Sequence, residues 1–209
     1  NAVLVVVGDF EKDETRQWIQ EYFGDLPSAE LPPVADISEP KQTAEKVFSK
    51  PDKLATRPAL AFAYHMPERN TPEYYAMGLI DQLLLQGDDA LLNQRFVKAK
   101  GYTGSVDGGI NLLGNMFNYN GPMLWMGSLI HDAEVPSDSI TAVLNQAIDE
   151  FTSKEVTQAD LDRALIKMRS DLYSNLGGFF GFGRADLLAS FALFDDDPGR
   201  INLLEGEFR

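Results

Sequence analysis

Two side chains in this sequence could act together on a developing negative charge, namely Arg95 and Tyr102. The apolar pattern predicts a helix over residues 88–100 that Gly101 ends, after which Tyr102 opens a strand. The helix end and the turn could bring a guanidinium and a phenol to one edge, where they would suit an oxyanion or a peptide carbonyl. Ordinary structural roles are the alternative, because arginine is common near helix C-termini and tyrosine packs well at the start of a strand.

The sequence contains few residues that could bind a metal or act as a nucleophile. The chain contains no cysteine, which excludes disulfides, thiolate metal sites and a cysteine nucleophile. Its two histidines, His65 and His131, lie far apart in the sequence. His131 and Glu134 would form at most half a zinc site, since zinc needs three or four converging ligands. No G-x-S-x-G elbow is present either, so we expect no metal and no cofactor to bind to this chain itself.

The glycine–phenylalanine cluster at residues 177–183 is the remaining unusual motif. It lacks the Lys-Ser/Thr pair of a phosphate-binding loop, and it does not follow a strand as a dinucleotide fingerprint would. We expect it to end a helix or to act as a hinge. The alternative is a hydrophobic surface that meets another domain.

Charge and composition exclude several partners. The chain has 209 residues with 18 Lys and Arg against 32 Asp and Glu, a net charge of −14. This balance argues against nucleic acid and against an anionic membrane surface as partners. No apolar run approaches the ~20 residues of a membrane span. A hydrophobic content of 44% is ordinary for a globular chain, and we expect residues 1–209 to form a single domain that is a fragment of a longer protein.

The order of elements predicts a two-layer α+β fold. Strands come in adjacent pairs, which favours an antiparallel or mixed sheet with the helices packed on one face. Residues 2–7 are a valine-rich run typical of a buried strand, and residues 27–40 are a proline-rich extended connection. The further strands are expected at 45–49, 59–66, 102–109 and 116–130, and the helices at 18–23, 72–86, 88–100, 137–151, 157–172 and 186–194.

Two of these elements carry sharper expectations. In the strand at 59–66, Leu60, Phe62 and Tyr64 fall on one face and three alanines on the other. Thr71 and Pro72 form a strong helix start, and the helix that follows is apolar almost all round. Such a helix should be buried on more than one side.

Taken together, the motifs resemble the second domain of the insulinase/pitrilysin-type zinc metallopeptidases, the inverzincins. No single motif decides this, but the order and spacing of all of them cover nearly the whole chain. The matching segments are the strand and Gly-Asp at 3–9, Tyr-Phe-Gly-Asp-Leu-Pro at 22–27, Leu-Leu-Asn-Gln-Arg at 91–95, Lys-Gly-Tyr at 100–102 and Thr-Gln-Ala-Asp-Leu at 157–161.

The resemblance implies where the chemistry would lie. The zinc motif of the family, H-x-x-E-H, belongs to its first domain and is absent from this sequence. Zinc and the general base would therefore come from a partner half, either upstream in the same chain or as a separate subunit. Active members supply an arginine–tyrosine pair from their zinc-free half, and Arg95 and Tyr102 match that pair in type and separation.

Two functions remain open on this basis. In the first, this domain is inactive alone, closes the peptide chamber of a zinc peptidase and offers Arg95 and Tyr102 to the peptide substrate. In the second, it is a non-catalytic structural or peptide-recognising subunit that resembles the core proteins of respiratory complexes. The arginine–tyrosine pair favours the first, because a purely structural subunit has no reason to keep both. A periplasmic location in a Gram-negative bacterium is expected, and the lack of cysteine is consistent with it.

Overall fold

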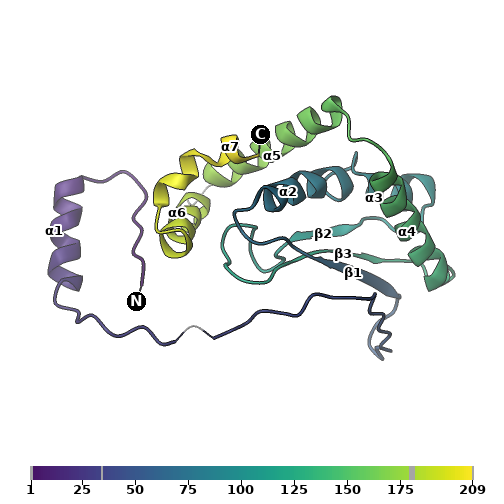
Figure 1. The fold of residues 1–209 in the computed structure, drawn as a ribbon, viewed down its shortest axis with the longest axis horizontal. Helices are drawn as coiled ribbons and strands as arrows, with labels where there is room; N and C mark the ends of the chain where they lie inside the picture. The colour runs from purple at the N-terminus through teal and green to yellow at the C-terminus, as the bar shows by residue number, and fades with distance from the viewer. Residues whose placement is uncertain (1, 34, 179–181, 209) are drawn as a thin grey trace.

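A small antiparallel sheet forms the base of the fold, and helices cover one of its faces (Figure 1). The computed structural model describes residues 2–33, 35–178 and 182–208. The three strands have the spatial order β1-β3-β2, and the α+β expectation is confirmed. The elements are α1 Lys12–Phe23, β1 Ala59–His65, α2 Pro72–Leu84, α3 Leu91–Asn93, a π-helix Gln94–Ala99, β2 Asp107–Ile110, β3 Leu124–Ile130, α4 Ser137–Ser153, α5 Gln158–Leu176, α6 Phe182–Phe194, a 3₁₀-helix Pro198–Asn202 and α7 Leu204–Glu207.

Strand β1 shows the predicted alternation of faces. Leu60 and Phe62 pack against the core, while Tyr64 on the same face is partly exposed at the end of the strand. Phe62 lies opposite Gly127 of β3 in the antiparallel register. A Cβ at Gly127 would come within 2.5 Å of the Phe62 ring, so the missing side chain of the glycine leaves the space that the ring occupies.

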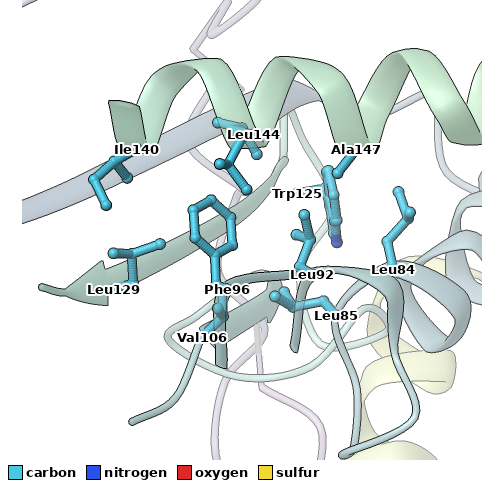
Figure 2. Close-up of a cluster of buried hydrophobic side chains, with 11 residues drawn as sticks. Leu84, Leu85, Leu92, Phe96, Val106, Trp125, Leu129, Ile140, Leu144 and Ala147 are labelled. Atoms are coloured by element: carbon cyan, nitrogen blue, oxygen red, sulfur yellow. The ribbon is translucent and has the colours of Figure 1, made fainter. Parts of the chain in front are cut away.

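Two clusters of buried side chains make up the core. The first joins β3, α4, the end of α2 and the α3/π-helix segment, and α4 contributes Ile140, Leu144 and Ala147 to it (Figure 2). The second lies between α2, α6 and the C-terminal α7. The first contains Leu84, Leu85, Leu92, Phe96, Val106, Trp125, Leu129, Ile140, Val143, Leu144 and Ala147, and the second is built around Tyr74, Phe117, Phe191, Leu204 and Phe208.

Helix α2 is buried on more than one side, as its apolar composition predicts. It starts at Pro72, and the Thr71 side chain caps it by accepting a hydrogen bond from the Tyr74 amide at 3.3 Å. Along its length it packs against α5, whose Met168 lies close to Gly78. A Cβ at Gly78 would come within 2.9 Å of Phe208, so the backbone of this helix packs closely against the second cluster.

The other helix boundaries follow their capping residues. Thr157 and Asp160 form a reciprocal capping box at the start of α5, where the sequence predicts a helix start. Gly177 ends α5, which confirms the helix-ending role expected for the first glycine of the 177–183 cluster. Residues 179–181 of that cluster lie outside the described residues. No described helix is long and apolar enough to cross a membrane.

Two predicted strands are wrong. Residues 2–7 form no strand, and Val3, Leu4, Val6 and Val7 are 37–55% exposed. Residues 45–49 form none either, and Phe48 is 88% exposed. The physical reason is the same for both, because a strand requires a neighbour for its backbone hydrogen bonds and no described segment pairs with either. In its described parts, residues 27–33 and 35–40, the proline-rich segment has no helix or strand and runs as an extended connection (Figure 1), as predicted.

Strands β2 and β3 are shorter than predicted, because polar side chains hold the chain in turns. Residues 102–106 lie outside β2, where the Thr103 hydroxyl donates to the Ile130 carbonyl oxygen at 2.7 Å. Residues 116–123 lie outside β3, next to an asparagine-rich turn in which the Asn118 side chain accepts hydrogen bonds from Asn111 and Asn115. Such side-chain contacts compete with the backbone ladder of a sheet.

The predicted helix at 88–100 is also different in detail. It begins at Leu91 rather than after Asp88, and it continues as a π-helix from Gln94 to Ala99. Gly101 ends it at a φ of +63°, a left-handed conformation that glycine adopts without steric cost. The predicted end of the helix is therefore correct, whereas its second half is a π-helix and not the regular α-helix that was predicted.

Candidate functional site

The π-helix and the turn after it position Arg95 and Tyr102. The Lys100 amide donates to the Arg95 carbonyl oxygen at 3.2 Å, five residues back, and the Tyr102 amide donates to the Phe96 carbonyl oxygen at 3.0 Å. These bonds, with the left-handed Gly101 between them, fix the path of the chain from the helix to Tyr102. Single π-turns inside helices occur frequently at functional sites.

The Arg95 side chain is held by an acid from a different helix. Its Nε and Nη2 atoms both donate to one carboxylate oxygen of Glu150 on α4, at 3.1 and 2.5 Å. The Arg95 side chain is 40% exposed and that of Glu150 is 23% exposed. The Nη1 group has no partner among the described residues. A fixed guanidinium with one free nitrogen is thus present on the surface beside the first core cluster.

Glu150 keeps its negative charge to well below its ordinary pKa because two cations contact it. The hydrogen bond from Arg95 and then that from Lys154, at 2.6 Å, lower the pKa of Glu150 to about 2. Arg95, Glu150 and Lys154 therefore carry one net positive charge together. This ion-pair triad keeps Arg95 oriented while leaving a cationic character at the site.

Tyr102 is anchored by its backbone and packs its ring on the core. Its carbonyl oxygen accepts a hydrogen bond from the Asp132 amide at 3.3 Å, just after β3. The ring is half-buried against the first core cluster. Its hydroxyl makes no hydrogen bond with any described residue. A phenol in this position is able to donate to another molecule.

The structure brings Arg95 and Tyr102 into one short segment but does not join them. No hydrogen bond links their side chains in the described part of the chain. Each has a donor without a partner, and such donors suit a carbonyl oxygen or an oxyanion. Their action on one common group stays a prediction.

The histidines do not fit a zinc site. His131 is almost fully buried next to the Asp132 carbonyl oxygen, while His65 lies near the Glu39 carboxylate on the exposed end of β1. Within residues 2–33, 35–178 and 182–208, no group of three or more histidines and acids comes together to hold a metal ion.

One acid that sequence reasoning missed lies at a cavity. Asp81 of α2 is 8% exposed and accepts a hydrogen bond from the Trp125 indole at 2.7 Å. Burial raises its pKa to about 6, against the lowering effect of the hydrogen bonds from Trp125 and Gln86. The cavity beside it has a volume of about 460 Å³ and is also lined by Gln82 and Asp171. An aspartate inside a run of apolar helix residues was the available sequence signal.

Comparison with known proteins decides the family. The family model described as the peptidase M16 inactive domain matches residues 1–168. The chain belongs to this family. The resemblance to the insulinase/pitrilysin-type peptidases is therefore confirmed, and the domain is of the zinc-free type.

A curated relative agrees with this assignment. The zinc protease PqqE of Helicobacter pylori is 21% identical over 182 residues, which cover 84% of this chain and 39% of the relative. The chain thus spans well under half of that protein. No H-x-x-E-H motif occurs in the M16 inactive domain described here, and zinc belongs to the partner half in this family.

Solved structures share the fold. A protease from Helicobacter pylori superposes with a TM-score of 0.82 at 18% identity, covering 97% of this chain and 47% of that chain. The inactive peptidase domain of a Bordetella parapertussis protein gives a TM-score of 0.58 at 18% identity, covering 72% and 77%. The M16 inactive domain from Pseudomonas fluorescens gives 0.55 at 21% identity, covering 72% and 33%.

Proposed function

We propose that this M16 inactive domain closes the peptide chamber of a zinc peptidase and offers Arg95 and Tyr102 to the bound peptide. The metal and the general base come from a zinc-bearing half. The observation that carries the proposal is the pair of unused donors on one short segment, namely the free Nη1 of Arg95 and the free hydroxyl of Tyr102.

The two residues would act on the substrate in different ways. When bound in the partner half, zinc would supply the polarised carbonyl and the activated water. The Tyr102 hydroxyl would donate a hydrogen bond to the oxygen on which negative charge develops. Arg95, held by Glu150, would bind a peptide carbonyl in the ground state as well as in the transition state. Loss of Tyr102 should therefore lower kcat, and loss of Arg95 should raise KM and lower kcat.

The proposal can be tested in the assembled two-half protein with peptide substrates. Tyr102→Phe removes one hydroxyl and no packing, and we expect kcat to fall by about 10²–10³, the usual value of one oxyanion donor. Tyr119→Phe is the matched control, because Tyr119 is an exposed tyrosine away from the π-helix segment. Arg95→Gln is compared with Arg163→Gln, where the arginine makes only surface ion pairs.

Equal rates for Tyr102→Phe and Tyr119→Phe would contradict the proposal. Such a result in an active protein would favour the alternative of a non-catalytic structural or peptide-recognising subunit. Circular dichroism should stay the same in all four variants and the urea midpoint should change little, so that a large loss of rate is not a loss of fold.

A further inference from the structure

The cavity of about 460 Å³ lies between α2, α5 and β2, and its wall has an apolar part and an acidic part. Its volume is that of a site for a small organic molecule. Arg95 and Tyr102 do not line it, so the proposed function leaves it unused. Among the described residues of the wall there are two acids and no lysine, arginine or histidine. The apolar part of the wall is formed by Met116, Phe117, Met168, Leu172, Leu187 and Phe208.

Asp81 brings one acceptor without a donor to this wall. Its Oδ1 atom accepts hydrogen bonds from the Trp125 indole at 2.7 Å and from the Gln86 side-chain amide at 3.3 Å. Its Oδ2 atom accepts none from any described residue. Burial raises the pKa of Asp81 to about 6, so this buried group is still an anion at pH 7.5. Buried anions in folded proteins are ordinarily paired with a cation.

Gln82 supplies a second acceptor without a donor. The residue is 5% exposed, and its Oε1 atom is buried with no hydrogen-bond partner among the described residues. Its Nε2 atom donates to Oδ2 of Asp171 at 3.2 Å, which places the amide group beside a second acid of the wall. Because a carboxylate only accepts, this bond also settles which amide atom is the oxygen. A buried acceptor that lacks a donor is rare and points to a group that is absent.

Lys167 of α5 acts on Asp81, but its donors are used elsewhere. Its Nζ atom donates to the carbonyl oxygens of Gln82 and Gln86, at 2.9 and 2.5 Å, and to the Asp89 carboxylate at 2.9 Å. These bonds take all three hydrogens of the ammonium group. Its charge is also the weakest of the influences on the pKa of Asp81. The free oxygens of Asp81 and Gln82 are therefore open to a donor from outside the chain.

We propose that this cavity binds a primary ammonium group carried on an apolar chain, with the ammonium between Asp81, Gln82 and Asp171 and the chain against the apolar wall. An ammonium group has three donors and no acceptor, which suits three oxygens. Its bonds to the two carboxylates would be charge-assisted. A metal ion fits less well, because no group of three acids or histidines comes together in the described part of the chain. The inference goes beyond the proposed function and does not depend on it.

The cost of Asp81 to the fold supports a binding role. A buried acid with a raised pKa lowers the stability of the folded chain at neutral pH. Residues that lower stability in this way, beside a cavity, are typical of functional sites. A bound ammonium would provide the missing opposite charge.

Calorimetric titration of the assembled two-half protein with n-hexylamine at pH 7.5 tests the proposal. We expect saturable binding with a Kd of about 1 mM or below, within the range that so few atoms can reach. Asp81→Asn should weaken it at least about tenfold, and Asp171→Asn should also weaken it, because each removes a charged acceptor. Asp162→Asn is the matched control, an exposed acid of α5 outside the cavity, and should bind as the parent does.

Matched ligands separate charge from chain. Hexanol and hexanoate carry the same chain without the positive charge, and neither should bind at the concentrations used. Equal affinity for hexanol, equal affinity of the parent and Asp81→Asn, or no binding to the parent would each overturn the inference. Asp81-dependent binding of calcium chloride that displaces hexylamine would indicate a metal site and would overturn it as well. Leucinamide and Nα-acetyl-lysine amide then distinguish a peptide N-terminus from a lysine side chain as the source of the ammonium.

The pH dependence gives a readout that only an ionised Asp81 would produce. Alkylammonium groups keep their charge from pH 5 to pH 8, whereas Asp81 gains a proton as the pH falls through about 6. The affinity of the parent for hexylamine should therefore fall below pH 6, and that of Asp81→Asn should stay low and nearly constant. An affinity of the parent that does not change between pH 5 and pH 8 would count against the ammonium site.

Discussion

Replacing Asp81 by asparagine should make this chain more stable at neutral pH. Asp81 is buried, and its pKa is raised from 3.8 to about 6 in the folded state. The folded state then binds a proton more tightly than the unfolded state does. The stabilising effect of protonation is fully present below pH 4 and is lost as pH rises through 6. The raised pKa corresponds to a penalty of about 3 kcal/mol above pH 7.

Asparagine removes that penalty and keeps an acceptor for Trp125. The side-chain oxygen of Asp81 accepts from the Trp125 indole, and an asparagine carbonyl oxygen can take the same bond. We expect the free energy of unfolding of Asp81→Asn to exceed that of the parent by up to about 3 kcal/mol at pH 7.5. The difference should shrink steadily between pH 7 and pH 4, because the parent regains its stability on protonation.

Urea unfolding of both proteins at intervals from pH 4 to pH 8 measures this difference directly. Other titrating groups cancel, since the two chains share them. Asp162→Asn, an exposed acid on α5, is the control and should differ from the parent by the same small amount at every pH. Parallel stability curves for the parent and Asp81→Asn would refute the argument that Asp81 is buried as a high-pKa acid.

Two other substitutions test how the helices are held. Arg69→Met should lower the free energy of unfolding in urea by about 3–5 kcal/mol, because Arg69 and Asp195 form an ion pair at 2.7 Å with both side chains 5% exposed. The control Arg163→Gln, at the surface, should lower it by under ~1 kcal/mol. Equal losses of stability in the two variants would contradict this prediction. Thr157→Ala removes the capping box of α5 and should cost about 1 kcal/mol with faster exchange of the Asp160 amide; unchanged exchange there would count against the cap.

Elements that carry their own start signals were predictable from the sequence. Thr71 and Pro72 predict the start of α2, and Thr157 with Asp160 predicts the start of α5, because capping depends on residues close in the chain. The alternating pattern of β1 gave both the strand and its buried face. The lengths of β2 and β3 were not predictable in this way, since Thr103 and the asparagine turn replace ladder bonds with side-chain bonds.

Residues 2–7 show the limit of strand prediction most clearly. A valine-rich composition tells that the side chains suit a pleated, buried surface. It does not tell which chain provides the neighbouring strand. The described residues provide none, and the structure accordingly leaves the segment exposed. The composition was therefore informative about the segment's chemistry, and wrong only about its place within this chain.

The residues of the candidate site also differ in how far the sequence could predict them. Arg95 and Tyr102 were found because they are close in sequence and match a family pattern. Glu150 was missed, because it reaches Arg95 from α4 and no spacing rule connects residues so far apart. Asp81 was missed although the sequence carried a signal for it. An acid among apolar helix residues must be buried, paired or exposed at a cavity, and Asp81 lines one.

The ion pair with Glu150 is what would let Arg95 act on a substrate in the proposed function while it is also held by the fold. A free guanidinium on the surface would sample many rotamers, and binding would have to order it. Glu150 takes two of the Arg95 donors and fixes the group, while Lys154 offsets the negative charge that Glu150 adds. The site keeps one net positive charge in a chain of net charge −14. In the proposed function, a peptide oxygen of partial negative charge would therefore meet a donor that is already oriented, and Glu150 and Lys154 would provide that orientation without touching the substrate.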